Sequence, residues 1–596
     1  MLIGRRFFTV GFKSLAHLSP NMDSLIAIGT AAAYLYSLIE IALNLPYPSP
    51  HNLYFESAGV IITLVSLGRF IEAKAKKRTG DAVQTLLELS PKQAAVIRDG
   101  REVIIDAVLL NVGDIIAVKP GGVFPADGVI VSGETTVDES MLTGESLPIE
   151  KKVGDYLYNG ALNKFGSVLY RAEKVGSGSV LAKIAELVET AQSSKAPIAR
   201  LADRVSAYFV PIVAALALLS ASFWFISGES FPFAMKIFIA VLIIACPCAL
   251  GLATPISIMV AAGIGARFGI LFKDGAAIER ASKLDTVFID KTGTATEGKL
   301  HIAEIIPKNG FSGEVILKFA AACESGSEHP LGRAIVEAYN LNNKAIPKAD
   351  NFTALAGYGV SCTVEGSRVL IGNRRLLEEN GFVIGEVEEG IGKSLIFIAI
   401  DGKFAGVFTF EDAIKPTSRR AVEKLKNLNL EVIMLTGDNY HAARSIAEAA
   451  GIERFISELT PADKALEVKR ARQAGKIVCM AGDGVNDAPA LAEADVGISL
   501  ASAADAAISS AGIILMKNDL LGAAAAIELS RKTVRNIKQN LFWAFAYNSL
   551  GIPIAMGVLH IFGAPALNPM IASLMMSFSS VSVVFNSLRL RNFSPL

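Results

Sequence analysis

The sequence predicts a multi-domain α-helical membrane protein that carries large polar domains of α/β and β structure. Its 596 residues are 52% hydrophobic and 19% charged, with a mean hydropathy of +0.44, which is too apolar for an ordinary soluble protein. Apolar runs long enough to cross a bilayer come in three pairs, near residues 23–44, 53–72, 205–227, 234–262, 539–562 and 567–588. Long polar segments follow the second and the fourth of these runs.

The charges beside the apolar runs predict the orientation of the chain. Basic residues follow the second run and the last run, namely Lys74, Lys76, Lys77, Arg78, Arg589 and Arg591. The short loops within the pairs carry no Lys or Arg. By the positive-inside rule, both polar segments and both termini are expected in the cytoplasm. The formal net charge of zero gives no support to nucleic-acid binding.

The fourth apolar run contains Cys246-Pro247-Cys248, with one thiol on each side of a proline. Proline removes a backbone donor and clashes with the carbonyl one turn back, so we expect the helix to open here. In lipid, freed backbone groups are tolerated only where they line a protein-buried or watery cavity. Thiolates at such an opening suit Cu(I) or another soft ion. The alternative is a kinked helix with two small buried cysteines.

The other three cysteines, Cys323, Cys362 and Cys479, lie in the segments predicted to be cytoplasmic. Thiols stay reduced in that compartment, so we expect no disulfide framework and interpret these residues as small buried side chains. The sequence contains no Cys-x-x-Cys pair.

The first polar segment, about 80–195, alternates short β-like runs with turns and contains Thr143-Gly144-Glu145. A glycine between a hydroxyl and a carboxylate suits a tight turn that presents the acid outward. An ordinary surface turn explains this tripeptide equally well.

The second polar segment, about 263–530, contains three apolar strands that each end in a polar loop. The loops read Asp290-Lys291-Thr292-Gly293-Thr294, then Thr436-Gly437-Asp438, then Asp483-Gly484-Val485-Asn486-Asp487. Carboxylates at the carboxyl ends of parallel strands lie where α/β sheets bind ligands. The three loops therefore predict one shared site.

The residues of these loops suit phosphoryl transfer. Asp290 is the candidate nucleophile, because a carboxylate can form an aspartyl-phosphate that divides the transfer into two steps. Phosphoryl oxygens would find donors in Thr292, Thr436, Gly437 and Lys464. Hard oxygen ligands for Mg²⁺ would come from Asp290, Thr292, Asp483 and Asp487.

The order of these motifs resembles the P-type ATPases over nearly the whole chain. The resemblance implies a haloacid-dehalogenase-like α/β phosphorylation domain, an α+β nucleotide-binding domain and a mainly β actuator domain. The expected boundaries are actuator 80–195, phosphorylation 263–308 and 410–530, nucleotide-binding 309–409, and membrane helices 21–79, 196–262 and 531–596. The resemblance further implies that ATP phosphorylates Asp290, and that Lys291 and Asp438 belong to the same catalytic centre. Glu145, with Thr143 and Gly144, would position water for dephosphorylation after a large domain rotation.

The insert at 309–409 resembles the nucleotide-binding domain of the heavy-metal (type IB) branch of that family. Its Ser327-Glu328-His329-Pro330, Gly357-Tyr358-Gly359 and Gly372-Asn373 carry the likeness. The resemblance implies adenine and phosphate contacts from Glu324, His329, Gly357, Gly359, Gly372 and Asn373. Glycines fit this role because they allow close backbone approach to a ligand.

The last two apolar runs resemble the signatures of the Cu(I)/Ag(I) exporters. They contain Asn540, Tyr547-Asn548, Met576 and Ser580 at the matching places. The resemblance implies a site for the transported ion formed by Cys246, Cys248, Tyr547, Asn548, Met576 and Ser580. A thioether beside two thiolates favours a monovalent soft ion over zinc. The alternative is that the polar residues hold helices together.

Three further residues match the transport route of those exporters. Met22 resembles a cytoplasmic entry ligand, and Glu56 is an acid near the outer end of a run. Asp203 lies near the cytoplasmic surface, where an acid favoured by a helix N-terminus is the alternative interpretation. Residues 1–20 resemble the amphipathic half of a platform helix, to which a copper chaperone would dock. We expect the preceding helix and the N-terminal metal-binding domains of such exporters to be absent.

These observations predict an ATPase of a prokaryotic inner membrane that exports Cu(I), or Ag(I), from the cytoplasm by alternating access. Three alternatives remain from the sequence. One is a metal-binding or regulatory membrane protein that does not pump, and another is a Zn(II)/Cd(II)-type exporter, although the last run lacks the acid and lysine expected there. A phosphatase fused to a membrane anchor would leave Tyr547, Asn548 and Met576 unexplained.

Overall fold

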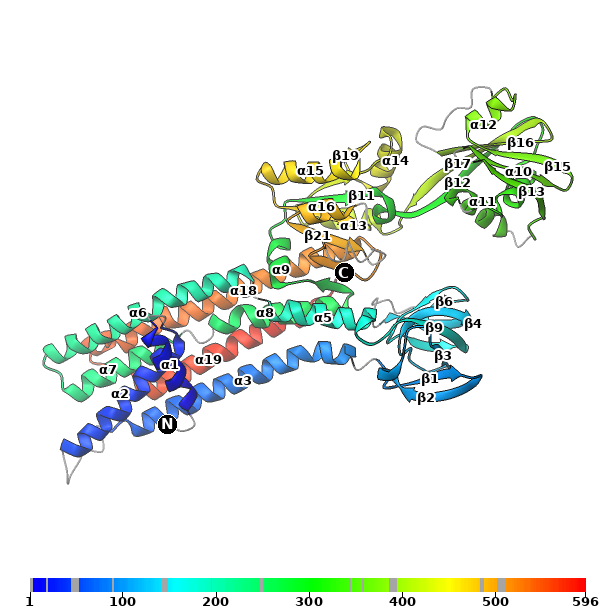
Figure 1. Ribbon diagram of the computed structural model, residues 1–596. Helices are drawn as coiled ribbons and strands as arrows, with labels where there is room; N and C mark the ends of the chain where they lie inside the picture. Colours follow the sequence, from blue (N-terminus) through cyan, green and yellow to red (C-terminus); the bar gives the residue numbers. More distant parts are fainter. Residues whose placement is uncertain are drawn as a thin grey trace. The chain divides into compact units, whose positions relative to one another are not determined.

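The computed structural model forms two compact units, Met1–Lys283 with Ala525–Leu596 (unit 1) and Leu284–Ala524 (unit 2) (Figure 1). It describes residues 4–17, 20–43, 53–87, 90–140, 148–194, 196–246, 250–327, 329–341, 345–355, 358–384, 394–482, 487–500 and 510–595.

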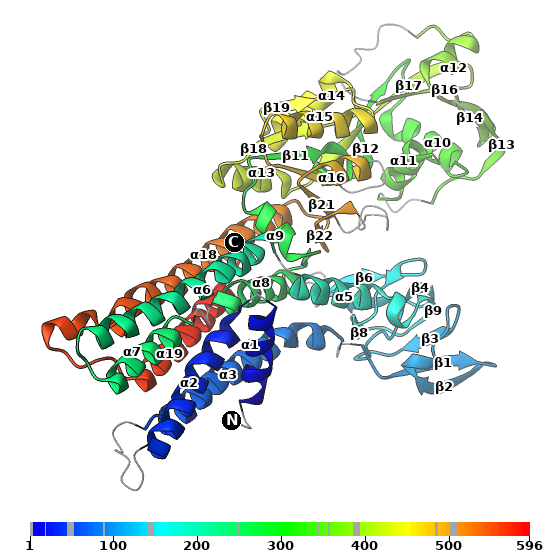
Figure 2. The same ribbon diagram turned by 60° about the vertical axis from the view of Figure 1, so that its left-hand side comes forward.

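Unit 1 contains the long apolar helices, which lie side by side in a bundle (Figures 1 and 2). Each predicted apolar run falls on a helix: α2 (Met22–Leu43), α3 (Phe55–Leu87), α6 (Pro197–Ile226), α7 (Phe231–Ile244) with α8 (Leu250–Arg267), α18 (Leu521–Ala555) and α19 (Pro569–Leu588). Among the described residues, three stretches are long and apolar enough to cross a membrane, namely Asp23–Leu43, Ala207–Ile226 and Pro569–Asn592.

The helix break expected at the proline is present. Helix α7 ends at Ile244, and α8 begins at Leu250. The last turn is closed by hydrogen bonds from the Ala245 amide to the Val241 carbonyl (3.2 Å) and from the Cys246 amide to the Ile243 carbonyl (3.1 Å). Pro247 and Cys248 lie outside the described residues. The chain therefore leaves helical geometry where the sequence predicts that it must.

A buried polar network ties α8 to α18 and α19. Asn540 Nδ2 donates to Ser257 Oγ (3.2 Å) and Ser587 Oγ (2.8 Å), and Ser257 Oγ donates to Asn536 Oδ1 (2.8 Å). Asn586 Nδ2 donates to Asn540 Oδ1 (2.9 Å). Buried polar groups in an apolar bundle need such partners, and the network fixes how these three helices meet.

The N-terminal helix α1 (Arg5–Ala16) docks on α2 and α3. A Cβ on Gly11 would lie 2.5 Å from the Asp23 carbonyl, so only glycine allows this close approach. Arg69 of α3 pairs with Asp23 and lies over the Phe7 ring at 4.4 Å. The helix has a buried face and exposed basic residues, in agreement with its predicted amphipathic character.

The β part of unit 1 lies at 90–174, as the alternating sequence pattern predicts. One sheet has the order β2-β1-β3-β9-β4-β7, and a smaller one has the order β6-β5-β8. The strands are β1 (Gln93–Arg98), β2 (Arg101–Asp106), β3 (Ile115–Val118), β4 (Asp127–Ser132), β5 (Thr135–Asp138), β6 (Ile149–Lys151), β7 (Tyr156–Leu157), β8 (Leu162–Phe165) and β9 (Val168–Lys174). Helix α5 (Val180–Ser193) follows and packs on α3 and α8, which joins this β part to the bundle.

Unit 2 is built around a parallel sheet with the order β22-β21-β20-β11-β18-β19. The strands are β11 (Thr286–Asp290), β18 (Glu431–Leu435), β19 (Arg454–Ile456), β20 (Val478–Gly482), β21 (Val496–Leu500) and β22 (Ile513–Leu515). The helices of this part are α13 (Ser418–Asn427), α14 (Tyr440–Ala450), α15 (Pro461–Gln473) and α16 (Ala488–Glu493). The α/β class predicted for this segment is confirmed.

The insert forms an antiparallel sheet with the order β12-β17-β16-β15-β14-β13. Its strands are β12 (Thr296–Pro307), β13 (Ala349–Leu355), β14 (Gly359–Val364), β15 (Ser367–Gly372), β16 (Ser394–Ile400) and β17 (Lys403–Ile414). Its helices are α10 (Gly313–Glu324), α11 (Pro330–Asn340) and α12 (Arg374–Glu379). The long strands β12 and β17 pair with each other and connect the insert to the parallel sheet.

One expectation about the cysteines is wrong. Cys323 and Cys362 form a disulfide with their Cα atoms 5.8 Å apart, whereas the sequence predicts separate reduced thiols. Helix α10 packs across β14, so residues 39 positions apart become neighbours. Cys479 is free and buried, as expected, and burial raises the pKa of its thiol.

Candidate functional site

The strands that lead into the three predicted loops end at one edge of the parallel sheet. In the register of β11 with β18, Asp290 lies beside Leu435, the residue before Thr436. On the other side, Ile289 lies beside Ala481 of β20, which leads into the third loop. Strands that run parallel end at the same edge, so the loop residues converge as the sequence predicts.

A buried ion triad lies at this edge. Lys464 Nζ donates to the Asp290 carboxylate and to Asp487 Oδ1, the latter at 2.9 Å. The three side chains are 10%, 6% and 2% exposed for Lys464, Asp290 and Asp487 respectively. Burial alone would lower the pKa of Lys464, but the two carboxylates outweigh it and raise that pKa above its usual value. Lys464 is therefore a permanent positive charge beside the candidate nucleophile.

Helix α15 holds Lys464 in place. Thr460 caps this helix, and its side chain and that of Asp463 exchange hydrogen bonds with each other's backbone N–H groups, which makes a capping box. Lys464 follows in the first turn, so its direction is fixed by a rigid helix start. The Asp487 side chain packs directly against the backbone of Gly482, since a Cβ on Gly482 would lie 2.6 Å from Asp487 Oδ2.

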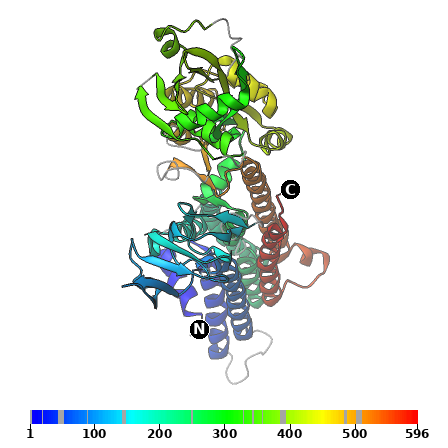
Figure 3. The ribbon, with the colours of Figure 1, turned by 90° about the vertical axis from the view of Figure 1, so that its right-hand side faces the viewer.

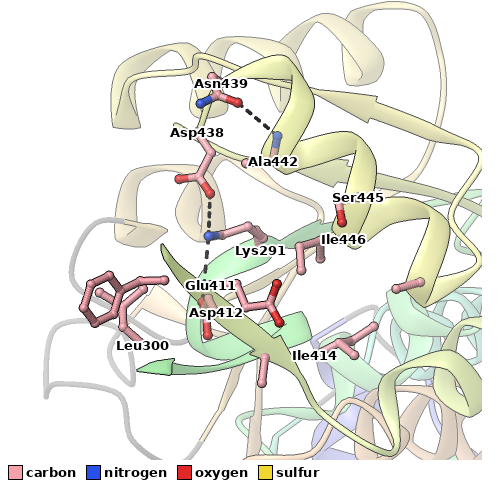
Figure 4. Close-up of a pocket in the computed structure, with 13 residues that line it drawn as sticks. Lys291, Leu300, Glu411, Asp412, Ile414, Asp438, Asn439, Ala442, Ser445 and Ile446 are labelled. Carbon is pink, nitrogen blue, oxygen red and sulfur yellow. Dashed lines mark hydrogen bonds and ion pairs between the residues drawn. The ribbon is translucent and has the colours of Figure 1, made fainter. Parts of the chain in front are cut away.

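Lys291 points toward a second group of acids, Asp438 and Asp412 (Figure 4). Its Nζ lies 2.6 Å from Asp438 Oδ2 and 3.8 Å from Asp412 Oδ2. These residues line a cavity of about 420 Å³. Lys291 thus joins the first loop to Asp438 at the start of α14 and to Asp412 near the end of β17. Asp412 was missed in the sequence analysis, where its signal is only an apolar strand that ends in acids.

The loop after Asp290 turns at Gly293, whose φ of 70° favours glycine. Lys415 Nζ donates to the Gly293 carbonyl (2.5 Å) and to Asn518 Oδ1 (2.7 Å), two contacts that the sequence analysis missed. Thr436 is 2% exposed, and its hydroxyl accepts a hydrogen bond from the Asp438 amide (3.1 Å). Thr292 is exposed and adjoins the nucleophile.

Carboxylate and hydroxyl oxygens are the ligand types that Mg²⁺ prefers, so the chemistry of the predicted ligands suits this ion. The carboxylates of Asp290 and Asp487 both contact the Lys464 ammonium group in this structure. Asp483 lies outside the described residues, as do Thr143, Gly144 and Glu145. Within the described ranges, no group of three or more His, Cys, Asp and Glu side chains gathers in a metal-binding arrangement.

The predicted nucleotide residues share one cavity of about 410 Å³ in the insert. Glu324, His329, Gly359, Gly372 and Asn373 all line it, and Gly357 lies outside the described residues. A Cβ on Gly359 would lie 2.0 Å from the Ile371 carbonyl, and one on Gly372 would lie 2.1 Å from the Tyr358 carbonyl. The two glycines, which lie opposite each other on the paired strands β14 and β15, therefore allow the backbone to pack closely beside the cavity.

Glu324 is the buried acid of this cavity. It is 5% exposed, and burial raises the pKa of its carboxyl, although a hydrogen bond with Ser327 acts in the opposite direction. A Cβ on Gly332 would lie 2.3 Å from Glu324 Oε2, so the carboxyl is seated against the first turn of α11. The sequence analysis did not identify Tyr358 and Ile396, which also line the cavity.

Most of the predicted metal residues are buried in the helix bundle. Cys246, Asn548, Met576 and Ser580 are 2%, 5%, 6% and 8% exposed, and Cys246 and Met576 belong to one apolar cluster. Within the described residues, Asn548 Nδ2 is covered and has no hydrogen-bond partner. Tyr547 differs from the others, because it is 43% exposed and packs on Trp543 at 6.1 Å between ring centroids. Cys248 lies outside the described residues.

The route residues are placed only in part. Met22 begins α2, and Asp203 lies in α6, but their side chains lie outside the described part of the structure. Glu56 is exposed in the first turn of α3. The role of all three stays a prediction.

Comparisons with known proteins agree with this geometry. Residues 284–495 match the haloacid dehalogenase-like hydrolase family, and residues 88–189 match the P-type ATPase actuator domain. A parallel sheet with a buried aspartate at its carboxyl edge and a separate β domain defines a phosphoryl-transferring ATPase of the membrane.

Relatives that match nearly the whole chain, which spans about three quarters of their own length, identify the family. A "copper-exporting P-type ATPase" of Bacillus subtilis is 47% identical over 99% of this chain and 74% of its own length. A "copper-transporting ATPase 1" of Rhizobium meliloti is 45% identical over 99% and 73%. A crystal structure of a zinc-transporting PIB-type ATPase in the E2·Pi state aligns with a TM-score of 0.64 at 31% identity, covering 99% of this chain and 93% of that one. The chain belongs to the P-type ATPase family.

Replacing Lys464 with Met is expected to destabilise the protein and to lower its phosphorylation. Removing one partner of a buried ion pair costs roughly 3–5 kcal/mol, because the remaining charges are left uncompensated. Thermal unfolding of the purified chain at neutral pH measures the loss of stability.

Lys469→Met is the matched control, since Lys469 is exposed on the same helix. The raised pKa of Lys464 means that its own contribution in the unsubstituted chain is fully present below about pH 10. A Lys464→Met protein with an unchanged unfolding temperature at neutral pH would contradict a stabilising role for the triad.

Replacing Glu324 with Ala is expected to weaken ATP binding by roughly ten- to a hundredfold. That range corresponds to the loss of one hydrogen bond to a charged group. Calorimetric titration of the full chain with ADP measures the change. Glu324→Gln should retain most of the affinity because it keeps a hydrogen-bonding oxygen, and Glu337→Ala, at an exposed acid of α11, should leave it unchanged. Equal affinities for all four proteins would remove Glu324 from the nucleotide site.

Proposed function

We propose that this protein exports Cu(I) from the cytoplasm by ATP hydrolysis, through an aspartyl-phosphate on Asp290 and alternating access of a metal site in the helix bundle. The observation that carries this proposal is the burial of Cys246 and Met576 in one cluster beside the break between α7 and α8. The names of the relatives from Bacillus subtilis and Rhizobium meliloti support the same ion.

The phosphoryl transfer follows from the triad. An Asp290 carboxylate oxygen attacks the γ-phosphorus of ATP, a bond to that oxygen forms, and the bond to the leaving ADP breaks. Lys464 neutralises the charge that gathers on the phosphoryl oxygens, and Thr436 and Gly437 lie on the adjoining loop. Mg²⁺ held by Asp290, Asp487, Thr292 and Asp483 would supply further neutralisation. Lys291, paired with Asp438, fixes the loop that bears the nucleophile.

The cavity in the insert is the proposed binding site of the ATP that phosphorylates Asp290. Glu324 and His329 are proposed to contact adenine, and Gly359, Gly372 and Asn373 to permit close approach of the nucleotide. Hydrolysis of the aspartyl-phosphate is assigned to Glu145 with Thr143 and Gly144, whose carboxylate would orient a water molecule. This assignment rests on sequence resemblance.

The metal residues favour a soft monovalent ion. A thiolate and a thioether in a covered, mostly apolar environment suit Cu(I) or Ag(I), which accept low coordination numbers. The zinc-transporting relative has the same fold, so the fold alone does not select the ion, and the side chains of the bundle must. The proposed site comprises Cys246, Cys248, Tyr547, Asn548, Met576 and Ser580. Of these, Cys246, Asn548, Met576 and Ser580 are buried in this structure, and Tyr547 is 43% exposed.

The distribution of basic residues along the chain supports a direction of transport. We propose a prokaryotic inner membrane with both large polar parts in the cytoplasm, because the basic residues flank the polar segments. The exposed basic residues of α1 offer a docking place for a cytoplasmic copper donor near Met22, the first proposed ligand of the route.

The purified chain in vesicles is expected to show Cu(I)-stimulated ATP hydrolysis and ATP-dependent Cu(I) uptake when its polar domains face outward. Asp290→Asn should abolish the acid-stable phosphoenzyme, because an amide is not a nucleophile for phosphorus. Met576→Leu should lose Cu(I) stimulation, whereas Met575→Leu should keep it, because Met575 is 41% exposed on the same helix.

Two outcomes would contradict this function. Stimulation by Zn(II) and not by Cu(I) would make the chain a divalent-metal pump. ATP hydrolysis without vesicle uptake would indicate a metal-responsive protein that does not transport.

A further inference from the structure

A basic pocket lies where α18 meets the end of α19, in a part of unit 1 that the proposed reaction does not use. Its volume is about 430 Å³. Three cations and three amides line it, namely Lys532, Arg535, Arg589, Asn536, Gln539 and Asn592, and no acid does. The short helix η7 (Arg589–Asn592) contributes Arg589, Leu590 and Asn592 to the lining, and Phe593 after it contacts Lys532 of α18. Figure 3 shows the C-terminus beside the last helices of the bundle.

The cations of the pocket are only partly neutralised by their neighbours. Lys532 pairs with Glu528 at 2.7 Å and lies over the Phe593 ring at 4.8 Å. Arg589 Nη1 donates to Asn586 Oδ1 at 3.1 Å, which leaves its other donors available. Arg535 is exposed and has no hydrogen-bond or ion-pair partner within the described residues. The pocket therefore has an excess of positive charge and of N–H donors.

Apolar side chains continue each wall of the pocket along the helices. Arg535, Gln539 and Phe542 are spaced by four and three residues, so they form one stripe on α18. Arg589 and Phe585 are four residues apart and form a stripe at the end of α19. Phe542 and Phe585 are 64% and 68% exposed. In a membrane-spanning bundle, such exposed rings contact lipid acyl chains, with the basic pocket at the level of the head groups.

The floor of the pocket is the polar network that joins α8, α18 and α19. Asn536 lines the pocket, accepts from Ser257 Oγ (2.8 Å) and donates to the Asn586 carbonyl (2.8 Å). Gln539 and Arg589, also in the lining, both contact Asn586. An anion in the pocket would therefore brace the helix that follows the break at Cys246 against the two last helices.

We propose that this basic pocket binds the phosphate of an anionic phospholipid, whose acyl chains run along Phe542 and Phe585. Arginine pairs with phosphate through two parallel hydrogen bonds, and Arg535 and Arg589 come from the two helices that form the walls. The exposed rings of Phe542 and Phe585 beside the pocket favour a lipid phosphate over free inorganic phosphate. The inference does not depend on which ion the protein transports.

Quenching of Trp543 by brominated phospholipids tests this proposal. Trp543 is 52% exposed, lies four residues after Gln539, and is one of two tryptophans in the chain. The part of the fluorescence quenching that comes from Trp543 is obtained by comparing the unsubstituted chain with the Trp543→Phe variant. Brominated phosphatidylglycerol should occupy the site near Trp543 in clear preference to brominated phosphatidylcholine when the full chain is reconstituted in mixtures of the two.

The relative affinity of the site for phosphatidylglycerol over phosphatidylcholine should fall roughly twenty-fold in Arg535→Gln/Arg589→Gln. Each basic residue near the membrane surface raises the affinity for anionic lipid by about fivefold at low salt. The matched control is Lys538→Gln/Arg591→Gln, which removes two exposed cations of the same region that do not line the pocket, and it should keep the preference. Arg535→Lys/Arg589→Lys, which conserves charge, should restore most of it.

Three results would overturn the proposal. The first is equal quenching by the two lipids in the unsubstituted chain. The second is an equal loss in the pocket variant and its control, which would indicate general surface charge. The third is loss of the preference when inorganic phosphate is added at constant ionic strength, which would make the soluble anion the ligand of the pocket.

Discussion

The candidate catalytic centre depends on one buried positive charge, Lys464, held between the carboxylates of Asp290 and Asp487. Two carboxylates this close and this covered would repel each other strongly without a cation between them. Helix α15 supplies that cation from a capped first turn, while β11 and β20 bring the two acids to the sheet edge. The same geometry that stabilises the folded unit also prepares a centre where a negative phosphoryl group can be received. Stability and chemistry here rest on the same contacts.

The second constraint acts in the helix bundle, where α7 ends at Ile244, shortly before the proline at position 247 of the sequence, and α8 begins at Leu250. Backbone groups freed at this break must be satisfied inside the protein, and the adjoining Cys246 is buried with Met576. Helix α8 leaves the break and is then fixed by Ser257 in a polar network with α18 and α19. A movement of α8 would therefore displace the proposed metal residues and also the helices α18 and α19 that form the basic pocket.

The sequence analysis predicted those features that local chemistry decides. An apolar strand followed by a polar loop was recognisable three times, and the parallel order of β18, β11 and β20 then placed Asp290 beside the other two loops. The helix break followed from proline alone. Features that depend on packing between distant segments were missed or mistaken. Cys323 meets Cys362 only because α10 packs on β14. Asp412 reaches Lys291 only through the pairing of β12 with β17.

The central claim is that Asp290 accepts the phosphoryl group of ATP. Chemical trapping tests it most directly: the chain is incubated with Mg²⁺ and ATP, quenched in acid and reduced with borohydride, which converts an aspartyl-phosphate to homoserine. Mass spectrometry of the peptide that contains residue 290 should then find homoserine at that position, and none in the Asp290→Asn variant. An unmodified Asp290, with the phosphoryl group recovered on any other residue, would contradict the account.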